Sequence, residues 1–312
     1  MKKTILATIV TSLFAATAAH SATVYDANGM TFEVYGDVEV QARKGISETT
    51  AKDDTAKTIN IDDSDFGFKV GYDIGHGFTA IGVVEVDGEN DDNKLAMDDA
   101  YVGLSSAQWG TLTAGQQVTI ADDQGIGNDY EFGIDNSSES YTDGKQVVKY
   151  TLDKGNYYGG ISYLVNTGAG ADGNDSLDAK LGARLGDLDL TVYYGNADKG
   201  AHDSETVVLE ARYAFTDLEL AASASSTDND SGVADATSFG LAAVYTVDKM
   251  AYSAAWSLVD TDGVDDVNKY FVNAAYSFNS NVTAYLEVAS NDEDLEGNDS
   301  EIGYAAGMAI TF

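Results

Sequence analysis

The sequence predicts an all-β chain in which sixteen antiparallel strands close into a transmembrane β-barrel. From Thr31 onward, apolar and polar side chains alternate with a period of two, as a strand requires and a helix does not permit. Short turns alternate with long polar connections, which is typical of barrels with short turns on one side of a membrane and longer loops on the other. The 312 residues include no cysteine, which excludes a disulfide framework and suits a barrel closed by backbone hydrogen bonds.

The amino-terminal residues predict export from the cytoplasm. Met1-Lys2-Lys3 is positively charged, residues 5–19 form an apolar run, and Ala19-His20-Ser21 offers the small residues of a cleavage site. A transmembrane helix is the competing interpretation, but a run of about 15 apolar residues is short for a bilayer. We therefore predict a signal peptide over residues 1–21 and a single barrel domain over residues 22–312.

The predicted mature chain is strongly acidic. Removing Lys2 and Lys3 from the 17 basic residues leaves 15 against 52 acidic ones, a formal charge of −37 (15 − 52). A chain without a basic stripe cannot displace counterions from phosphates, so nucleic-acid binding is excluded. Disorder is excluded as well, because 44% of the residues are hydrophobic and 19 of them are tyrosines.

Residues 32–40 show the pattern that identifies each strand. Apolar side chains such as Phe32 and Val38 fall on one face, and acidic ones such as Glu33 and Asp37 fall on the other. The sixteen predicted strands cover residues 31–44, 64–74, 77–87, 95–106, 109–117, 145–153, 156–165, 177–186, 188–196, 205–215, 218–227, 236–247, 250–259, 268–278, 281–290 and 301–312. Seven short turns alternate with eight long connections, at 46–63, 88–94, 118–144, 166–176, 197–204, 228–235, 260–267 and 291–300.

The polarity of the strands distinguishes this chain from a soluble β-sandwich, whose outward faces would be polar. Residues 188–194 and 282–288 each present one apolar face, which gains from contact with lipid. The opposite residues, such as Asp189, Thr191 and Glu287, are then expected to face water in the lumen, because charges on a lipid face are costly. Aromatic residues near the strand ends predict girdles at the two membrane interfaces.

The longest connection contains an acidic, glycine-punctuated stretch from Ile120 to Ser140. If the strands close a barrel, this stretch is long enough to fold inward and narrow the lumen. Its core, Tyr130-Glu131-Phe132-Gly133, resembles the Pro-Glu-Phe-Gly-Gly signature in the constriction loop of Gram-negative general-diffusion porins. Tyr130 replaces the proline, and Ile134 replaces the second glycine.

The resemblance extends to residues 22–29, 66–69 and 100–104, and to the final strand, which ends on an aromatic residue, Phe312. It implies a cell outer-membrane location, a sixteen-stranded barrel whose third loop folds into the lumen, and a homotrimer. The partners that it implies are small hydrophilic solutes and cations, outer-membrane lipid and lipopolysaccharide, and the outer-membrane barrel assembly machinery.

Porins of this type set their pore with an acidic group on the third loop that faces basic residues on the opposite wall. Glu131 stands at the signature glutamate, with Asp129 and Asp135 nearby. At the positions where the family has basic residues, this chain has Asp37, Asp65, Asp98, Gln116 and Asp143. Glu85 completes the set of residues that we predict to line the constriction. Asp99 adjoins Asp98, so strict alternation predicts that the two side chains point to opposite faces.

Each acidic residue alone is explained by solvation of a polar lumen, but together they predict a field that attracts cations. We therefore expect a water-filled, cation-preferring channel for passive diffusion of ions and small hydrophilic solutes. A substrate-specific porin, for example for oligosaccharides, and a non-conducting structural or adhesin-like barrel are the alternatives. Crowded carboxylates disfavour one another's charged forms, so the constriction should titrate above the ordinary value of about 4.

The sequence shows no constellation of catalytic residues. After the predicted signal peptide only two histidines occur, His76 in a predicted turn and His202 in a predicted loop, on opposite sides of the membrane in this topology. The sequence pattern does not identify a nucleophile with a base beside it. An enzymatic activity, a cofactor and a resident metal site are therefore not expected.

Overall fold

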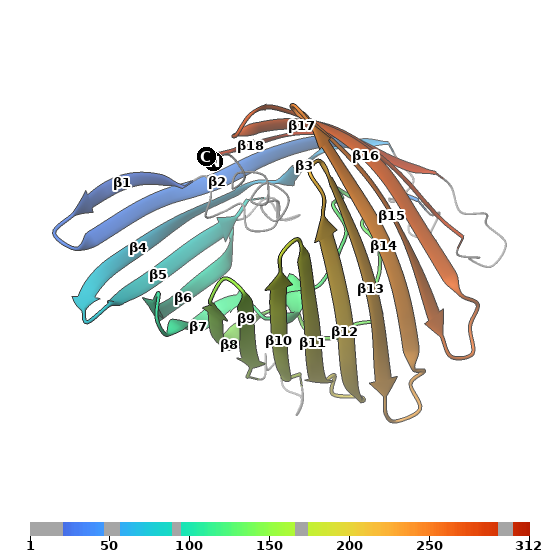
Figure 1. Ribbon diagram of the computed structural model, residues 1–312, viewed down its shortest axis with the longest axis horizontal. Helices are drawn as coiled ribbons and strands as arrows, with labels where there is room; N and C mark the ends of the chain where they lie inside the picture. Colours follow the sequence, from blue (N-terminus) through green and yellow to red (C-terminus); the bar gives the residue numbers. More distant parts are fainter. Residues whose placement is uncertain (1–20, 47–56, 89–94, 166–173, 293–301) are drawn as a thin grey trace.

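The computed structural model of the protein describes residues 21–46, 57–88, 95–165, 174–292 and 302–312. Apart from Ser21, the predicted signal peptide lies outside the described residues. In the described part of the chain, no helix combines the length and the apolar character needed to cross a bilayer. Strands dominate the fold (Figure 1).

The described residues form eighteen strand segments and one short 3-10 helix, η1 (Ala121–Asp123). The strand segments are β1 (Ala22–Ala27), β2 (Met30–Lys44), β3 (Thr58–Asp63), β4 (Asp65–Gly75), β5 (Phe78–Asp87), β6 (Ala96–Ser106), β7 (Gly110–Val118), β8 (Asp143–Asp153), β9 (Tyr157–Leu164), β10 (Ser176–Leu185), β11 (Leu188–Asp198), β12 (Asp203–Ala214), β13 (Leu218–Asn229), β14 (Ala236–Val247), β15 (Met250–Thr261), β16 (Val267–Asn279), β17 (Val282–Asn291) and β18 (Gly303–Thr311).

Sixteen antiparallel strands close the barrel, because two pairs of segments each occupy the place of one strand. β3 and β4 pair one after the other with the same edge of β2, with only Ser64 between them. On the other edge of β2, β1 pairs near Met30 and β18 pairs from Asp37 to Lys44. Since β18 also pairs with β17, the described strands form a closed ring (Figure 1). The predicted fold class is confirmed.

Each predicted strand lies within two residues of an observed one at both ends, but β1 and β3 were not predicted. The sequence pattern did not predict β3, for a local reason. Asp62, Asp63, Ser64 and Asp65 are consecutive polar residues, so the alternation stops there. A register shift opposite Glu39 then resets the pairing of β3 with β2, as a β-bulge does.

The two faces of each strand differ as the alternation predicts. On β11, Leu190, Val192 and Tyr194 point outward and are 37–39% exposed, whereas Tyr193 between them is buried. The apolar outward row is the surface that the sequence predicts to face lipid, and the inward row lines the interior.

Inward-facing tyrosines lie across glycines of the neighbouring strand. Tyr35 pairs with Gly67 and Tyr285 pairs with Gly307. A Cβ atom at Gly67 would lie 2.3 Å from the Tyr35 ring, and one at Gly307 would lie 2.4 Å from the Tyr285 ring. These glycines are therefore required because the rings occupy the space that any larger side chain needs.

Candidate pore constriction

The connection between β7 and β8, residues 119–142, runs along the inward face of the wall. Its apolar side chains are buried there: Ile120 packs with Tyr193 and Val208, and Ile126 packs with Phe271 and inward-facing alanines. Its hydrogen bonds reach side chains on β2, β9, β11, β12, β13, β15, β16 and β17. The segment is thus fastened to one large part of the ring.

Glu287 on β17 holds the stretch that carries the porin-like signature. Its carboxylate accepts hydrogen bonds from the backbone N–H groups of Tyr130, Glu131 and Phe132, at 2.8, 3.1 and 2.7 Å. The Asn273 side chain donates a fourth, at 2.9 Å. Consecutive N–H groups form a concave site for an anion, and here the anion is a wall residue. Glu287 faces inward as predicted, but it is only 1% exposed and does not face free water.

Glu210 and Arg212 on β12 hold the peptide groups around Gly125. The Glu210 carboxylate accepts the Gly125 N–H at 2.6 Å, and the Arg212 guanidinium donates to the Gly125 carbonyl. Gly125 has φ +127°, a backbone conformation that favours glycine. The clamp and the glycine together fix the direction of the segment after η1.

Glu131, the signature glutamate, is paired with the wall of β2. Its carboxylate accepts a hydrogen bond from Gln41 at 2.6 Å and forms an ion pair with Arg43. The Glu131 side chain is 11% exposed, so its charge is compensated at short range. The sequence pattern predicts acidic residues on the wall opposite Glu131 and gives no sign that Arg43 pairs with it.

The other two predicted acidic residues of the segment differ in their surroundings. Asp135 forms an ion pair with Lys269 at 3.1 Å. Asp129 lies close to the backbone of Gly133. Burial raises the pKa of Asp129 above its usual range, and the neighbouring charge of Glu287 adds to this shift.

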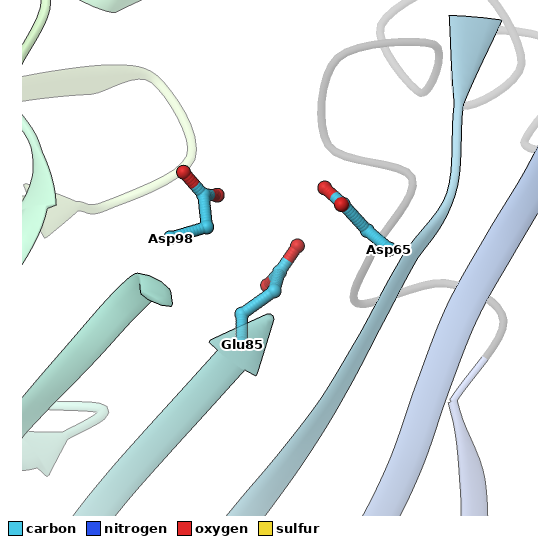
Figure 2. Close-up of side chains that lie close together, drawn as sticks. All are labelled: Asp65, Glu85 and Asp98. Carbon is cyan, nitrogen blue, oxygen red and sulfur yellow. The ribbon is translucent and has the colours of Figure 1, made fainter. Parts of the chain in front are cut away.

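Three of the predicted wall carboxylates come together on β4, β5 and β6. Asp65, Glu85 and Asp98 point toward one another (Figure 2), and one carboxylate oxygen of each lies within 4.8 Å of those of the other two. Glu85 is only 7% exposed and accepts a hydrogen bond from the Tyr35 hydroxyl at 2.6 Å. We call Asp65, Glu85 and Asp98 the wall triad. Asp37 lies on the inward row of the adjacent β2, where its charge interacts with those of Asp65 and Glu85.

The prediction that Asp98 and Asp99 point to opposite faces is wrong. Val84 of β5 pairs with Ala100, but Val86 pairs with Met97, so two residues of β6 lie opposite Glu85 alone. This is a β-bulge, and it suspends the alternation on which the prediction depended. Asp98 belongs to the wall triad. Asp99 is also near enough to Glu85 for their charges to interact.

The last two predicted residues are not members of the triad, although the charge of Asp143 interacts with that of Asp98. Gln116 pairs with Ala100 on the outward row, and its side chain donates to the Met97 carbonyl at 2.7 Å. The assignment of Gln116 to the constriction is therefore corrected: its neighbour Gln117, 2% exposed, takes the inward position. Asp143 begins β8 opposite Val118 and is exposed.

Comparison with known proteins agrees with this architecture. A family model described as Gram-negative porin matches residues 7–296. The chain belongs to the Gram-negative porin family. This porin therefore resides in the outer membrane. It is 32% identical over 341 residues to porin-like protein H of Photobacterium profundum, with both chains covered completely.

Two solved structures show the same fold as this porin. The trimer form of OmpT of Vibrio cholerae has a TM-score of 0.76 at 17% identity, with 91% of this chain and 100% of that one covered. An anion-selective porin from Comamonas acidovorans has a TM-score of 0.75 at 15% identity, with the same two coverages. At these identities the likeness concerns the fold alone.

Sequence reasoning missed the side chains of the porin that hold the segment, above all Glu287, Glu210, Arg212 and Arg43. The alternation does place each of them on an inward row. What they bind lies between 85 and 157 positions away in the chain. No pattern within a single strand carries that information.

Proposed function

We propose that this porin forms a water-filled channel that admits ions and small hydrophilic solutes by passive diffusion and prefers cations. The observation that carries the proposal is the wall triad. Three inward carboxylates on adjacent strands, held within 4.8 Å of one another, concentrate counter-ions between low-dielectric walls. The proposal includes no catalysed reaction.

The placement of the 119–142 segment supports the same reading. The segment is fastened to β2 and to most of the wall from β9 to β17. The passage that it narrows is then bounded on its other side by β4, β5 and β6. That side carries Asp65, Glu85, Asp98 and Asp99. An ion that passes between the segment and this wall is therefore close to these carboxylates.

The fold itself does not decide ion preference, because a porin described as anion-selective shares it. The preference must follow from the side chains that line the lumen. Among the described residues, Asp65, Glu85 and Asp98 of this wall lie together, and none of them takes part in the three ion pairs with lysine or arginine that hold the segment.

The proposal extends to processing and assembly. Residues 1–21 would be removed as a signal peptide, and residues 22–312 would form the mature barrel. The mature barrel would be folded by the outer-membrane assembly machinery, with outer-membrane lipid and lipopolysaccharide around it. The trimer form of the similar Vibrio structure supports a homotrimer. Gel electrophoresis tests this assembly: the purified porin should migrate as a trimer when unheated and as a monomer after heating.

Reversal potentials measured across a planar bilayer test the ion preference. With a dilute KCl gradient at neutral pH, the purified porin should show a potential that favours K⁺ over Cl⁻. Preference for Cl⁻ would contradict the proposal. Saturable block by a sugar would instead support a substrate-specific channel, and absence of conductance would support a structural barrel.

A further inference from the structure

We propose that the basic side chains which contact the 119–142 segment are anchors that position it, and do not form a basic wall that attracts anions. The inference rests on the proposed function, in which this segment narrows the channel. Six lysines and arginines among the described residues contact the segment or Val118, the residue just before it, and they are spread along its whole length.

Three anchors hold the first half of the segment. Lys149 on β8 donates to the carbonyl of Val118 at 2.7 Å, where the segment leaves β7. Lys180 on β10 pairs with Asp123 at 2.6 Å, and Arg212 on β12 donates to the carbonyl of Gly125. The anchors therefore come from alternate strands and meet the segment in chain order.

Three more anchors hold the second half. Arg43 on β2 pairs with Glu131, and Lys269 on β16 pairs with Asp135 at 3.1 Å. Lys199, just after β11, places its ammonium 3.6 Å from the centre of the Tyr141 ring, a favourable cation–π distance. The second half is thus fixed from strands on widely separated parts of the ring.

The chemistry of the contacts indicates a holding role. Two of the six donate to backbone carbonyls, at Val118 and Gly125, which carry no net charge but are hydrogen-bond acceptors that need a donor. The Lys180 and Lys269 side chains are only 16% and 19% exposed, although their partners Asp123 and Asp135 are 45% and 52% exposed, so it is the two cations that are withdrawn from the lumen. A cation used in this way offers little free charge to a passing anion.

An anchor and a free lumen cation give different results when they are changed. Loss of either makes the lumen more acidic and raises cation preference. Only loss of an anchor loosens the segment, which should widen the largest solute that passes and increase fluctuations of the open-channel current. The anchor's effect should also be reversed by exchanging the two charges of the pair.

The pair of Lys180 and Asp123 allows this test in the full-length porin. Lys180→Asp, Asp123→Lys and the double exchange are compared with Lys69→Asp, in single-channel recordings and in liposome swelling with sugars of increasing size. Lys69 is an inward basic residue whose ion pair is with Glu33, at 3.9 Å, and not with the segment. We expect each single change at the pair to raise current noise and the entry of large sugars several-fold, and the double exchange to restore both.

Lys69→Asp should shift only the reversal potential. If Lys180→Asp behaves like Lys69→Asp, or if the double exchange does no better than either single change, the anchoring role is refuted. Should these variants fail to form trimers, the same exchange at Lys269 and Asp135 decides the matter. The reversal potential of the unmodified porin tests the proposed cation preference separately, so the two ideas fail independently.

Discussion

The carboxylate of Glu287 lies 2.7 Å from the backbone nitrogen of Phe132, the third of three successive N–H groups that it accepts. The contact joins β17 to the middle of a segment more than 150 residues earlier in the chain. It also places the neighbouring Glu131 side chain within reach of Arg43 on β2. The buried carboxylate of Glu287 on β17 thus positions the signature stretch so that it also contacts β2.

Replacement of Glu287 should loosen this stretch. Glu287→Ala leaves three backbone donors without their acceptor, and each unsatisfied buried donor costs about 1–3 kcal/mol before water rehydrates it. We expect a lower midpoint of denaturant unfolding and noisier open-channel currents. Glu287→Gln keeps one carbonyl oxygen as acceptor and should show a smaller effect. Equal, negligible effects of both variants would show that the apolar contacts of Ile126 hold the segment alone.

Removal of wall-triad charges should lower cation preference. Asp65→Asn and Asp98→Asn each remove one of three carboxylates that lie within 4.8 Å of one another, so each should reduce the reversal potential in a dilute KCl gradient. The double variant should reduce it further. Asp228→Asn, at an exposed position near the end of β13, is the matched control. Equal shifts from wall and control variants would show that total surface charge sets the preference.

Ionic strength should modulate the preference of the unmodified porin. The screening length falls from about 30 Å at 0.01 M salt to about 3 Å at 1 M. Fixed carboxylates should therefore dominate conduction in dilute KCl and lose most of their influence in concentrated KCl. The measurement is the ratio of K⁺ to Cl⁻ permeability over this range. A ratio that stays constant would point to size or direct coordination as the source of preference.

The titration of Asp129 should appear in stability as well as in conduction. Burial raises its pKa in the folded protein, so the folded state binds a proton more readily than the unfolded chain does. Stability from this group therefore rises as pH falls through the raised pKa and is lowest once Asp129 is fully ionised. Asp129→Asn should raise the unfolding temperature at pH 7 and have little effect at acidic pH. An opposite pH trend would mean that the attraction of Asp129 to the charge of Lys269 outweighs burial.

Partial desolvation also raises the pKa of Asp122, although this side chain is exposed, and the charge of Asp123 adds to the shift. As pH falls below neutral, Asp122 and Asp129 should thus lose their charges before an ordinary aspartate does. Cation preference should weaken over the same range. Reversal potentials of the unmodified porin and of Asp122→Asn, measured between pH 7 and pH 4, check this, and a steeper fall in the variant would contradict it.

A methyl group at Gly307 should disturb the wall under the segment. Its Cβ would lie 2.4 Å from the ring of Tyr285, which stacks on Tyr130 with centroids 4.1 Å apart and also bonds Glu39. Overpacking of this kind costs about 1–3 kcal/mol. Gly307→Ala should therefore lower the unfolding temperature. Gly155→Ala is the control for added volume alone: a Cβ there meets no neighbouring atom, but its φ of +81° adds backbone strain. The cost at Gly307 should be the larger.

The barrel was predictable because a membrane restricts what a strand can be. Every backbone group must be paired within the ring, and every outward side chain must tolerate lipid, so the pattern along each strand reports its face directly. For this reason the alternation found all sixteen strands to within two residues. It failed at Asp98–Asp99 and at Asp62–Asp65, where β-bulges break the rule of two.

By itself, then, the sequence determined the ring, its inward and outward faces, and the acidity of the lumen, because these depend on neighbours one or two positions apart. Only the tertiary structure decided which charges are free and which are used. It paired Glu131 with Arg43, buried Glu287 beneath the segment, and left Asp65, Glu85 and Asp98 together on the other wall. Those relations join residues distant in the chain, and distance across a closed ring is set by curvature and register, which no local pattern encodes.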